Sequence, residues 1–402
     1  MPTTDDRRAE PPSSRAMRPS RRSGIAPFIV MEILAAANAR AATGADVIHL
    51  EVGEPGGGPP AMVLDAARAA LDRPGLGYTE ALGLPALRRR IAEHYRRRHG
   101  VDVPIERIVV TNGASGAFIL AFLAAFDAGD RVAIGEPGYP AYRNILQALD
   151  VEVVPIATDL STRFQPTTAH LDELNEPIRG LIVASPANPT GTTLDATSLA
   201  ALGAWCRDRS AWLIADEIYQ GITYEAPASS ILESSSEAIV VNSFSKYFCM
   251  TGWRLGWLVL PLALIEPVTR LAQNLFISPP AISQHAALAA FDATDELKAR
   301  IARYRRNRDR LRAALLRAEV VELAPADGAF YLYAEISPFG LDSPDLCRAV
   351  LAETGVAITP GVDFDPRRGQ HWVRLSFAGD ETGVTEAARR LEAWLGARRR
   401  AS

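Results

Sequence analysis

The stretch Ala238-Ile239-Val240-Val241-Asn242-Ser243-Phe244-Ser245-Lys246 runs from a short apolar segment into a serine-rich turn that ends in a lysine. Only two of the 43 basic residues are lysines, Lys246 and Lys298, and the others are arginines. A lysine can lose its proton and form an imine with an aldehyde, which an arginine cannot do. Most lysines are exposed surface charges, and Lys298 fits that interpretation because it lies in the charged segment 295–300. Lys246 follows a strand-like segment instead, so we take it as the candidate reactive amine.

Similar short apolar runs recur through the middle of the chain, at residues 108–110, 131–134, 151–154, 181–184, 212–215 and 256–260. Between most of them lie helix-length segments, at residues 115–126, 141–149 and 195–209. This alternation is typical of an α/β fold in which buried, mostly parallel strands are covered by helices. Ligands of such sheets bind beyond the carboxyl ends of the strands. The residues that follow each run are therefore the candidate site.

The last third of the chain has a different pattern and predicts a smaller α+β unit. We expect a charged helix over residues 294–319, strands near 320–323 and 329–335, a helix over 343–353, a strand at 372–377 and a closing helix. An early helix over residues 28–42 is expected to pack with this unit. The predicted organisation is a disordered tail (1–23), an N-terminal segment packing with the small domain (24–52), a large cofactor-binding domain (53–295) and a small C-terminal domain (296–402).

Composition excludes several classes of protein. A net charge of −4 argues against a nucleic-acid partner. The three cysteines have no Cys-x-x-Cys spacing, which excludes a disulfide framework and a cysteine-rich zinc site and favours the reducing cytoplasm. The longest apolar run is too short to cross a bilayer, and no apolar segment typical of a secretory signal follows the N-terminus. We therefore expect a cytoplasmic protein with no membrane partner.

Two of the strand ends carry residues suited to a ring or an anion. Residues 111–116 contain small side chains before a helix, which allows backbone N–H groups to approach an anion. The alternative is a simple turn in which Ser115 caps the helix. Tyr139 lies in a turn after the run 131–134, where an aromatic side chain can cover the sheet edge or simply pack on the surface.

The remaining strand ends carry an aimed amide, a carboxylate and two hydroxyl groups. Two prolines and a glycine fix the loop 185–191 and aim Asn188. Asp216 ends a buried run, so its carboxylate needs a cationic partner, and an ion pair with an arginine is the structural alternative. Ser243, Ser245 and Arg254 together can bind a phosphate dianion.

An aldehyde cofactor with a phosphate and a basic ring nitrogen requires five kinds of group: an amine, a phosphate site, an aromatic side chain to stack on its ring, an amide and a carboxylate. With these residues, the sequence resembles the fold-type I, pyridoxal-phosphate-dependent class I/II aminotransferases from about Arg22 to the C-terminus. The resemblance rests on motifs in a fixed order: Asn188-Pro189-Thr190-Gly191, Asp216-Glu217-Ile218-Tyr219, Ser243-Phe244-Ser245-Lys246 and Arg254. It implies a seven-stranded sheet and transfer of an amino group from an L-amino acid to a 2-oxo acid by an aldimine/ketimine mechanism.

The resemblance also implies roles for the cofactor site. Lys246 would bind the aldehyde of pyridoxal 5'-phosphate and later carry the 1,3-proton transfer, and Asp216 would pair with the protonated ring nitrogen. Tyr139 would stack on the ring, while Asn188 and Tyr219 would hydrogen-bond its oxygen. The phosphate would be held by Gly113, Ala114, Ser115, Ser243, Ser245 and Arg254.

Substrate recognition and assembly follow from the same resemblance. Arg374 would clamp the substrate carboxylate, with Gly53 and Asn188 beside it. Tyr78, in Gly77-Tyr78-Thr79, matches a tyrosine that reaches the phosphate of the partner subunit, which implies a homodimer with shared active sites.

The nature of the donor is open at this stage. One aspartate-preferring subgroup has a lysine where this chain has Ser115, and Arg143 could replace that cation. An apolar pocket could instead be lined by Phe28, Ile29, Phe330 and Phe364, and we favour neutral aliphatic or aromatic donors. The scaffold also supports lyases, such as C–S β-lyases and enzymes similar to aminocyclopropane carboxylate synthase. A ligand-sensing role is disfavoured because the residues before Gly24 cannot hold a DNA-binding domain.

Overall fold

The computed structural model describes residues 17–72 and 75–399. Its largest element is a sheet with the strand order β2-β8-β7-β6-β5-β3-β4. Strands β3 to β7 run parallel to one another, and β8 runs antiparallel to both β2 and β7. The strands span Ile108–Thr111 (β2), Arg131–Glu136 (β3), Glu152–Ala157 (β4), Gly180–Ala184 (β5), Trp212–Asp216 (β6), Ile239–Ser243 (β7) and Gly256–Val259 (β8). The predicted, mostly parallel α/β sheet is confirmed.

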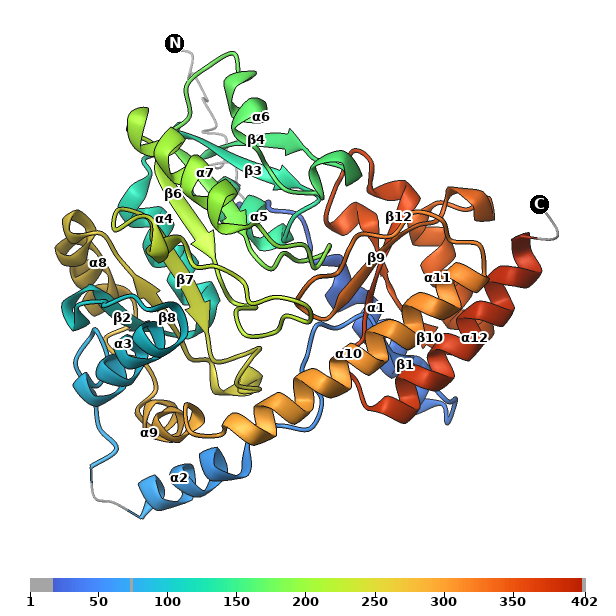
Figure 1. Cartoon of the computed structure of the whole chain (residues 1–402), viewed down its shortest axis with the longest axis horizontal. Helices are drawn as coiled ribbons and strands as arrows, with labels where there is room; N and C mark the ends of the chain where they lie inside the picture. Colours follow the sequence, from blue (N-terminus) through green and yellow to red (C-terminus); the bar gives the residue numbers. More distant parts are fainter. Residues whose placement is uncertain (1–16, 73–74, 400–402) are drawn as a thin grey trace, which may run out of the picture.

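Helices cover both faces of this sheet, because its strands carry apolar side chains on both sides. One face packs against α3 (Pro85–His99), α7 (Ala196–Asp208) and α9 (Ala281–Ala290). The other packs against α4 (Gly113–Ala125), α5 (Pro140–Ala148) and α8 (Leu262–Leu275). Two further helices, α2 (Ala61–Leu71) and α6 (Thr168–Asp172), lie at the periphery (Figure 1).

The C-terminal part has its own apolar core, beside the large sheet (Figure 1). Its antiparallel sheet has the order β11-β12-β9, formed by Thr359–Pro360, Trp372–Ser376 and Tyr331–Glu335. Around it lie α10 (Thr294–Arg317), α11 (Ser343–Thr354) and α12 (Glu381–Arg399). The strand predicted near residues 320–323 is reduced to a single bridge between Leu323 and Ala334.

The N-terminal segment connects to the C-terminal part. Its strand β1 (Ile48–His49) pairs in parallel with β10 (Val356–Ala357). Helix α1 (Ile29–Ala42) has no capping bond from its own N-cap side chain, and its first amides bond instead to Asp363, at 3.3 Å from Ile29 and 3.4 Å from Val30. A distant carboxylate therefore fixes the start of α1.

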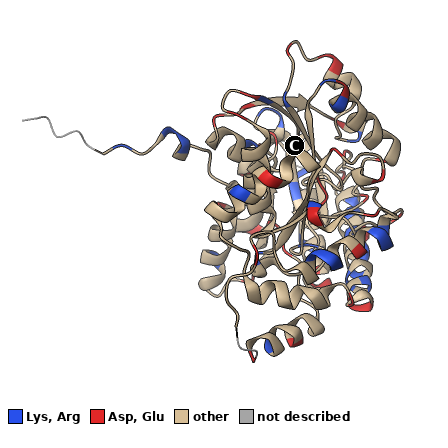
Figure 2. Ribbon diagram, turned by 90° about the vertical axis from the view of Figure 1, so that its left-hand side faces the viewer, with Lys and Arg blue, Asp and Glu red and all other residues tan. Residues whose placement is uncertain are grey.

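Part of the predicted tail is structured. Residues 1–16 of that tail lie outside the described residues, but Arg21–Ser23 form a 3-10 helix. Arg22 pairs with Asp150 at 3.1 Å. Along the ribbon in Figure 2, the acidic and the basic residues are interspersed. In residues 17–72 and 75–399, every helix is too short or too polar to cross a membrane.

Candidate active site

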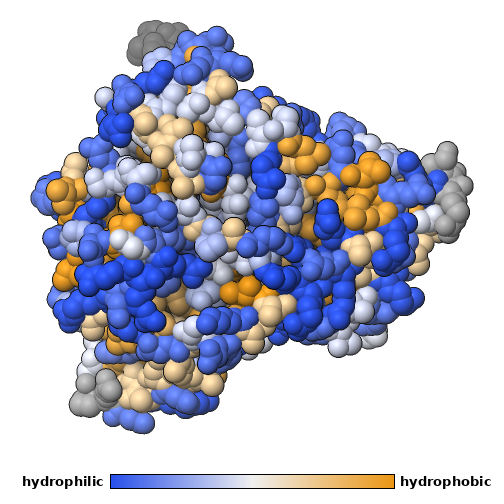
Figure 3. All heavy atoms as spheres, in the orientation of Figure 1, coloured by the Kyte–Doolittle hydropathy of each residue, from blue (hydrophilic) through white to orange (hydrophobic). Residues whose placement is uncertain are grey.

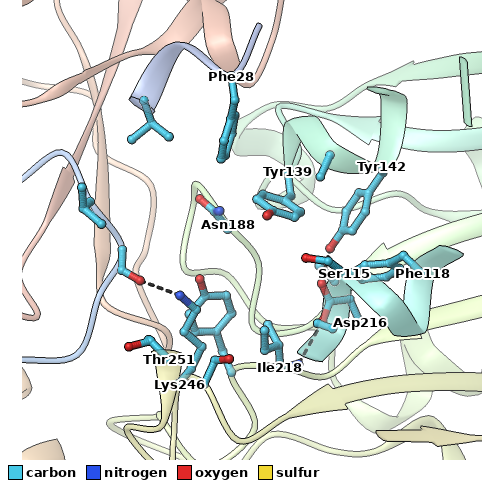
Figure 4. Close-up of a pocket in the computed structure, with 18 of the residues that line it drawn as sticks. Phe28, Ser115, Phe118, Tyr139, Tyr142, Asn188, Asp216, Ile218, Lys246 and Thr251 are labelled. Atoms are coloured by element: carbon cyan, nitrogen blue, oxygen red, sulfur yellow. Dashed lines mark hydrogen bonds between the residues drawn. The ribbon is translucent and has the colours of Figure 1, made fainter. Parts of the chain in front are cut away.

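A cavity of about 230 Å³ lies at the carboxyl ends of the large-sheet strands, where β6 and β7 deliver Asp216 and the segment that leads to Lys246 (Figure 4). Helix α1 and strands β9 and β12 close its other side. The cavity brings together most of the residues expected from the sequence: Gly53, Ala114, Ser115, Tyr139, Asn188, Asp216, Tyr219, Ser245, Lys246, Arg254 and Arg374.

Lys246 lies three residues beyond the end of β7, and its side chain reaches across the cavity. Its Nζ donates a hydrogen bond of 2.6 Å to the carbonyl oxygen of Gly53 (Figure 4). Burial, together with the nearby positive charge of Arg374, lowers the pKa of this amine to about 8. An amine with that pKa is partly unprotonated near neutral pH and can act as a nucleophile.

Asp216 is the last residue of β6 and is 4% exposed. Its carboxylate accepts hydrogen bonds from the hydroxyl of Tyr142 and, at 3.0 Å, from the amide of Ile218. Burial raises the pKa of Asp216 to about 6, although both hydrogen bonds oppose that shift. Neither hydrogen-bond partner carries a positive charge. A cationic group in the cavity, such as a protonated ring nitrogen, would therefore be stabilised by the Asp216 carboxylate.

The start of α4 suits an anion. No side chain caps this helix, its first turn holds no acidic residue, and Ala114 and Ser115 face the cavity. Ser245 and Arg254 approach the same place from the segment around Lys246. Free N–H groups at a helix N-terminus, hydroxyl groups and a guanidinium are together a phosphate-binding set.

Two residues expected to bind the phosphate lie behind this surface. A Cβ atom at Gly113 would be 2.5 Å from the guanidinium of Arg254, so this glycine allows the arginine to pack against the turn. The hydroxyl of Ser243 lies 3.0 Å from that of Ser245 and is 1% exposed. Both residues therefore support the phosphate set rather than face the cavity.

Arg374 is buried in strand β12 and is suited to a carboxylate. Its Nη1 donates to Asn188 Oδ1 at 3.0 Å, and its Nη2 donates to the carbonyl of Glu51. The guanidinium lies over the ring of Tyr331, with its carbon 4.5 Å from the ring centre, and its Nε has no hydrogen-bond partner. The neutral partners leave the charge of Arg374 uncompensated in the cavity, where a planar carboxylate fits it.

Two tyrosines of the site escaped sequence reasoning. Tyr142, whose hydroxyl donates to Asp216, follows Tyr139 by one helical turn. This spacing could have predicted that the two tyrosines face the same side. The hydroxyl of Tyr331 lies 2.7 Å from that of Tyr219. A Cβ atom at Gly53 would lie 1.8 Å from the Tyr331 oxygen, so only glycine fits at that position. No local sequence signal places Tyr331 there, because its position depends on β9 pairing with β12.

Several expectations about side-chain pockets are wrong in detail. Phe28 lines the cavity together with Val30 and Met31, and these two replace the expected Ile29. Phe330 and Phe364 are fully buried beneath the site. The ring centre of Phe330 lies 6.0 Å from Lys246 Nζ, and that of Phe364 lies 4.7 Å from the guanidinium carbon of Arg374.

Two further candidates lie away from the cavity. Arg143 pairs with Glu136 at 3.6 Å and donates to the carbonyl of Asp363 at 3.2 Å, so it is not available as a distal cation. Tyr78 is 85% exposed on the surface of this chain.

With this geometry established, similarity to known proteins identifies the class. The family described as Aminotransferase class I and II matches residues 45–391, and the chain belongs to it. The chain is thus a transaminase, which transfers amino groups between amino acids and 2-oxo acids. Enzymes of this family use pyridoxal phosphate.

Individual relatives cover nearly the whole chain. It is 51% identical to a valine–pyruvate aminotransferase of Mycobacterium tuberculosis over 93% of this chain and 97% of that protein. A crystal structure of an aminotransferase from the same organism superposes with a TM-score of 0.93 at 50% identity, covering 95% of this chain and 100% of that one. The aspartate aminotransferase of Thermus thermophilus with maleate gives 0.88 at 31% identity, covering 94% and 100%. The predicted family and fold are confirmed.

Proposed function

We propose that this chain uses pyridoxal phosphate held at Lys246 to transfer the amino group of a neutral, aliphatic or aromatic L-amino acid to a 2-oxo acid. The observation that carries the donor class is the charge of the cavity. Among the described residues that line it, the cations are Lys246, Arg254 and Arg374. Lys246 would bind the cofactor, Arg254 its phosphate and Arg374 the α-carboxylate of the substrate. A second substrate carboxylate would therefore be buried without a cationic partner, which is costly.

The residues around Asp216 fit the cofactor. When bound, pyridoxal phosphate supplies an aldehyde that condenses with amines and a protonated ring that accepts the electrons of a bond broken at the substrate Cα. Asp216 would hold the proton on the ring nitrogen, and Tyr142 would orient its carboxylate. Asn188 and Tyr219 would bind the ring oxygen, Tyr139 would cover the ring face, and Ser115, Ser245 and Arg254 would bind the phosphate.

Lys246 and Arg374 would divide the work on the substrate. Arg374, which lines the cavity and has no ion-pair partner among the described residues, would bind the α-carboxylate. Lys246 would then move a proton at the substrate Cα, a step that requires an unprotonated amine in a site shielded from water. Its lowered pKa of about 8 supports that role.

The side chain of the donor would meet an apolar wall. Phe28, just before α1, lines the cavity together with Val30 and Met31 of α1, and Phe118 and Ile145 line it from α4 and α5. The name of the relative from Mycobacterium tuberculosis makes valine and pyruvate the first pair to test.

A donor and acceptor screen on the purified holoenzyme tests this proposal. Valine, leucine and phenylalanine should each exceed aspartate in kcat/KM, with pyruvate and 2-oxoglutarate compared as acceptors. Turnover should require the 2-oxo acid, since a lyase would release products without one. If aspartate is the best donor, the apolar assignment of the cavity is wrong.

We further propose a cytoplasmic homodimer in which Tyr78 of each subunit reaches the partner's phosphate site. The high exposure of Tyr78, an amphipathic aromatic residue, supports a role at an interface, and three buried, unpaired cysteines suit a reducing compartment. Mixing inactive Lys246→Ala subunits with Tyr78→Ala subunits should restore part of the activity, because one site of each hybrid would be intact. An active monomer in sedimentation would contradict the shared site.

A further inference from the structure

A second cavity, of about 260 Å³, lies behind the segment that carries Lys246. It is bounded by α3, by Tyr247 and Phe248, by Phe291 and by the start of α10. The hydrophilic surface of this region, which includes α3, is seen at the lower left of Figure 3. None of the roles described for the transaminase involves this cavity.

The interior of this cavity is aromatic and uncharged. His94 lies at its base, with its ring centre 5.9 Å from that of Phe248 and 5.5 Å from that of Phe291. Burial, together with the nearby charges of Arg98, His99 and Arg97, lowers the pKa of His94 to about 3, so the imidazole is neutral. Tyr247 packs against Phe248 with ring centres 4.9 Å apart. These rings offer flat faces and edges to a planar ligand.

The rim of the cavity is cationic. Arg90 is neutralised by Glu93 and Asp292, whereas neither Arg97 nor Arg98 forms an ion pair within residues 17–72 and 75–399. The Nε of Arg98 is buried and has no hydrogen-bond partner, and its guanidinium carbon lies 5.5 Å above the centre of the Tyr247 ring. Two uncompensated guanidinium groups thus stand over an aromatic interior.

We propose that this cavity binds a small aromatic carboxylate, with the ring against Phe248, Phe291 and His94 and the carboxylate on Arg97 and Arg98. The aromatic interior favours a ring over a simple anion, and the planar guanidinium groups favour a carboxylate over a neutral ring. Its volume is below the roughly 300–1,000 Å³ typical of drug-sized ligands, which restricts the ligand to about one ring.

The position of this cavity links it to the catalytic segment. Tyr247 directly follows Lys246, and its ring presses on Gly221, where a Cβ atom would lie 2.5 Å from the tyrosine ring. Gly221 is two residues beyond Tyr219. A ligand that contacts Tyr247 therefore touches the residue that follows Lys246 in the chain. The same residue packs against Gly221, near Tyr219.

Calorimetric titration with benzoate tests the proposal. The holoenzyme should carry Arg374→Lys, so that binding of benzoate at the catalytic arginine is weakened and does not mask the second cavity. We expect saturable binding of one benzoate per subunit, with inorganic phosphate and benzyl alcohol each at least about tenfold weaker. Addition of Arg98→Gln should weaken benzoate binding by about tenfold or more, the usual loss for a charged hydrogen bond.

Matched variants keep this test decisive. Arg89→Gln removes an exposed arginine of the same helix that is outside the cavity lining, and benzoate binding should be unchanged. Arg97→Gln provides a second rim variant if Arg98→Gln fails to fold. The proposal is overturned if no saturable binding occurs, if the rim variants bind benzoate normally, or if phosphate binds as tightly as benzoate.

Discussion

The two walls of the catalytic cavity differ in the kind of chemistry they present. The large-domain wall, formed by Ser115, Asp216, Ser245 and Lys246, holds an amine and a carboxylate whose pKa values burial has moved toward neutrality. The opposite wall, formed by α1, Tyr331 and Arg374, holds a fixed charge, aromatic rings and aliphatic side chains. Proton transfer belongs to the first wall and recognition to the second. Substitutions on the two walls should therefore change different kinetic constants.

The largest expected effect is that of Lys246→Ala. The variant should lose transamination altogether, because it lacks the amine that moves the proton, while it still binds the cofactor through the phosphate set. Absorbance of the bound cofactor and a coupled assay would measure both properties. Lys298→Ala, which removes the exposed lysine of α10, is the matched control and should be fully active. Appreciable turnover by Lys246→Ala would remove the basis for the whole assignment.

Asp216→Asn should lower kcat by roughly a hundredfold or more, on the order of 3 kcal/mol, because an amide cannot hold the ring nitrogen protonated. Glu217→Gln is an instructive comparison. Glu217 is also buried but accepts bonds from Ser230, at 2.9 Å, and Ile231, at 3.0 Å, away from the cavity lining. That substitution should change the melting temperature rather than kcat. Near-normal kcat in folded, cofactor-loaded Asp216→Asn would contradict the assigned role.

The reactivity of Lys246 should depend on pH in the cofactor-free protein. Only the unprotonated amine attacks an aldehyde, and a lysine with a pKa lowered to about 8 loses its proton as the pH rises through that value. Adduct formation with pyridoxal, which has no phosphate, should then rise roughly fiftyfold between pH 6 and pH 8. The rates are measured by absorbance, with Lys246→Ala as the blank. A midpoint near the ordinary lysine value of about 10.4 would show that burial does not lower this pKa in solution.

Arg374→Lys should act on the recognition wall and raise KM. A lysine lacks the planar fork that matches a carboxylate, so the loss should be about 1.5–3 kcal/mol for every donor. The increase should run in parallel across valine, leucine and phenylalanine, because all of them share the α-carboxylate. Arg143→Gln, on an arginine that pairs with Glu136 outside the cavity, should leave KM close to that of the wild type. An increase confined to one donor would place Arg374 at the side chain instead.

The two walls also differ in how well the sequence predicts them. Lys246, Asp216 and Asn188 follow strands directly, so a correct assignment of the strands places them at one sheet edge. Tyr331 and the α1 residues could not be found in that way, since their positions depend on the pairing of β9 with β12 and on contacts between residues more than 300 positions apart. Ile29 was chosen where Val30 and Met31 line the cavity, because the face that α1 turns to the cavity depends on its contacts with distant residues such as Asp363. Short-range motifs therefore predicted the chemistry, and long-range packing determined the pocket.

The smallest expected effect concerns that distant cap. Asp363→Ala removes the acceptor of the Ile29 and Val30 amides, which should cost about 0.5–2 kcal/mol of stability in α1. Because Phe28, Val30 and Met31 form one side of the cavity, a loosened α1 should reduce the preference for valine over alanine by a few fold and leave kcat for alanine almost unchanged. Asp363→Asn keeps one acceptor oxygen and should retain most of the preference. Equal kcat/KM ratios in all three proteins would show that the wall holds its position without the cap, and that donor choice is set by the large-domain side chains Phe118 and Ile145 instead.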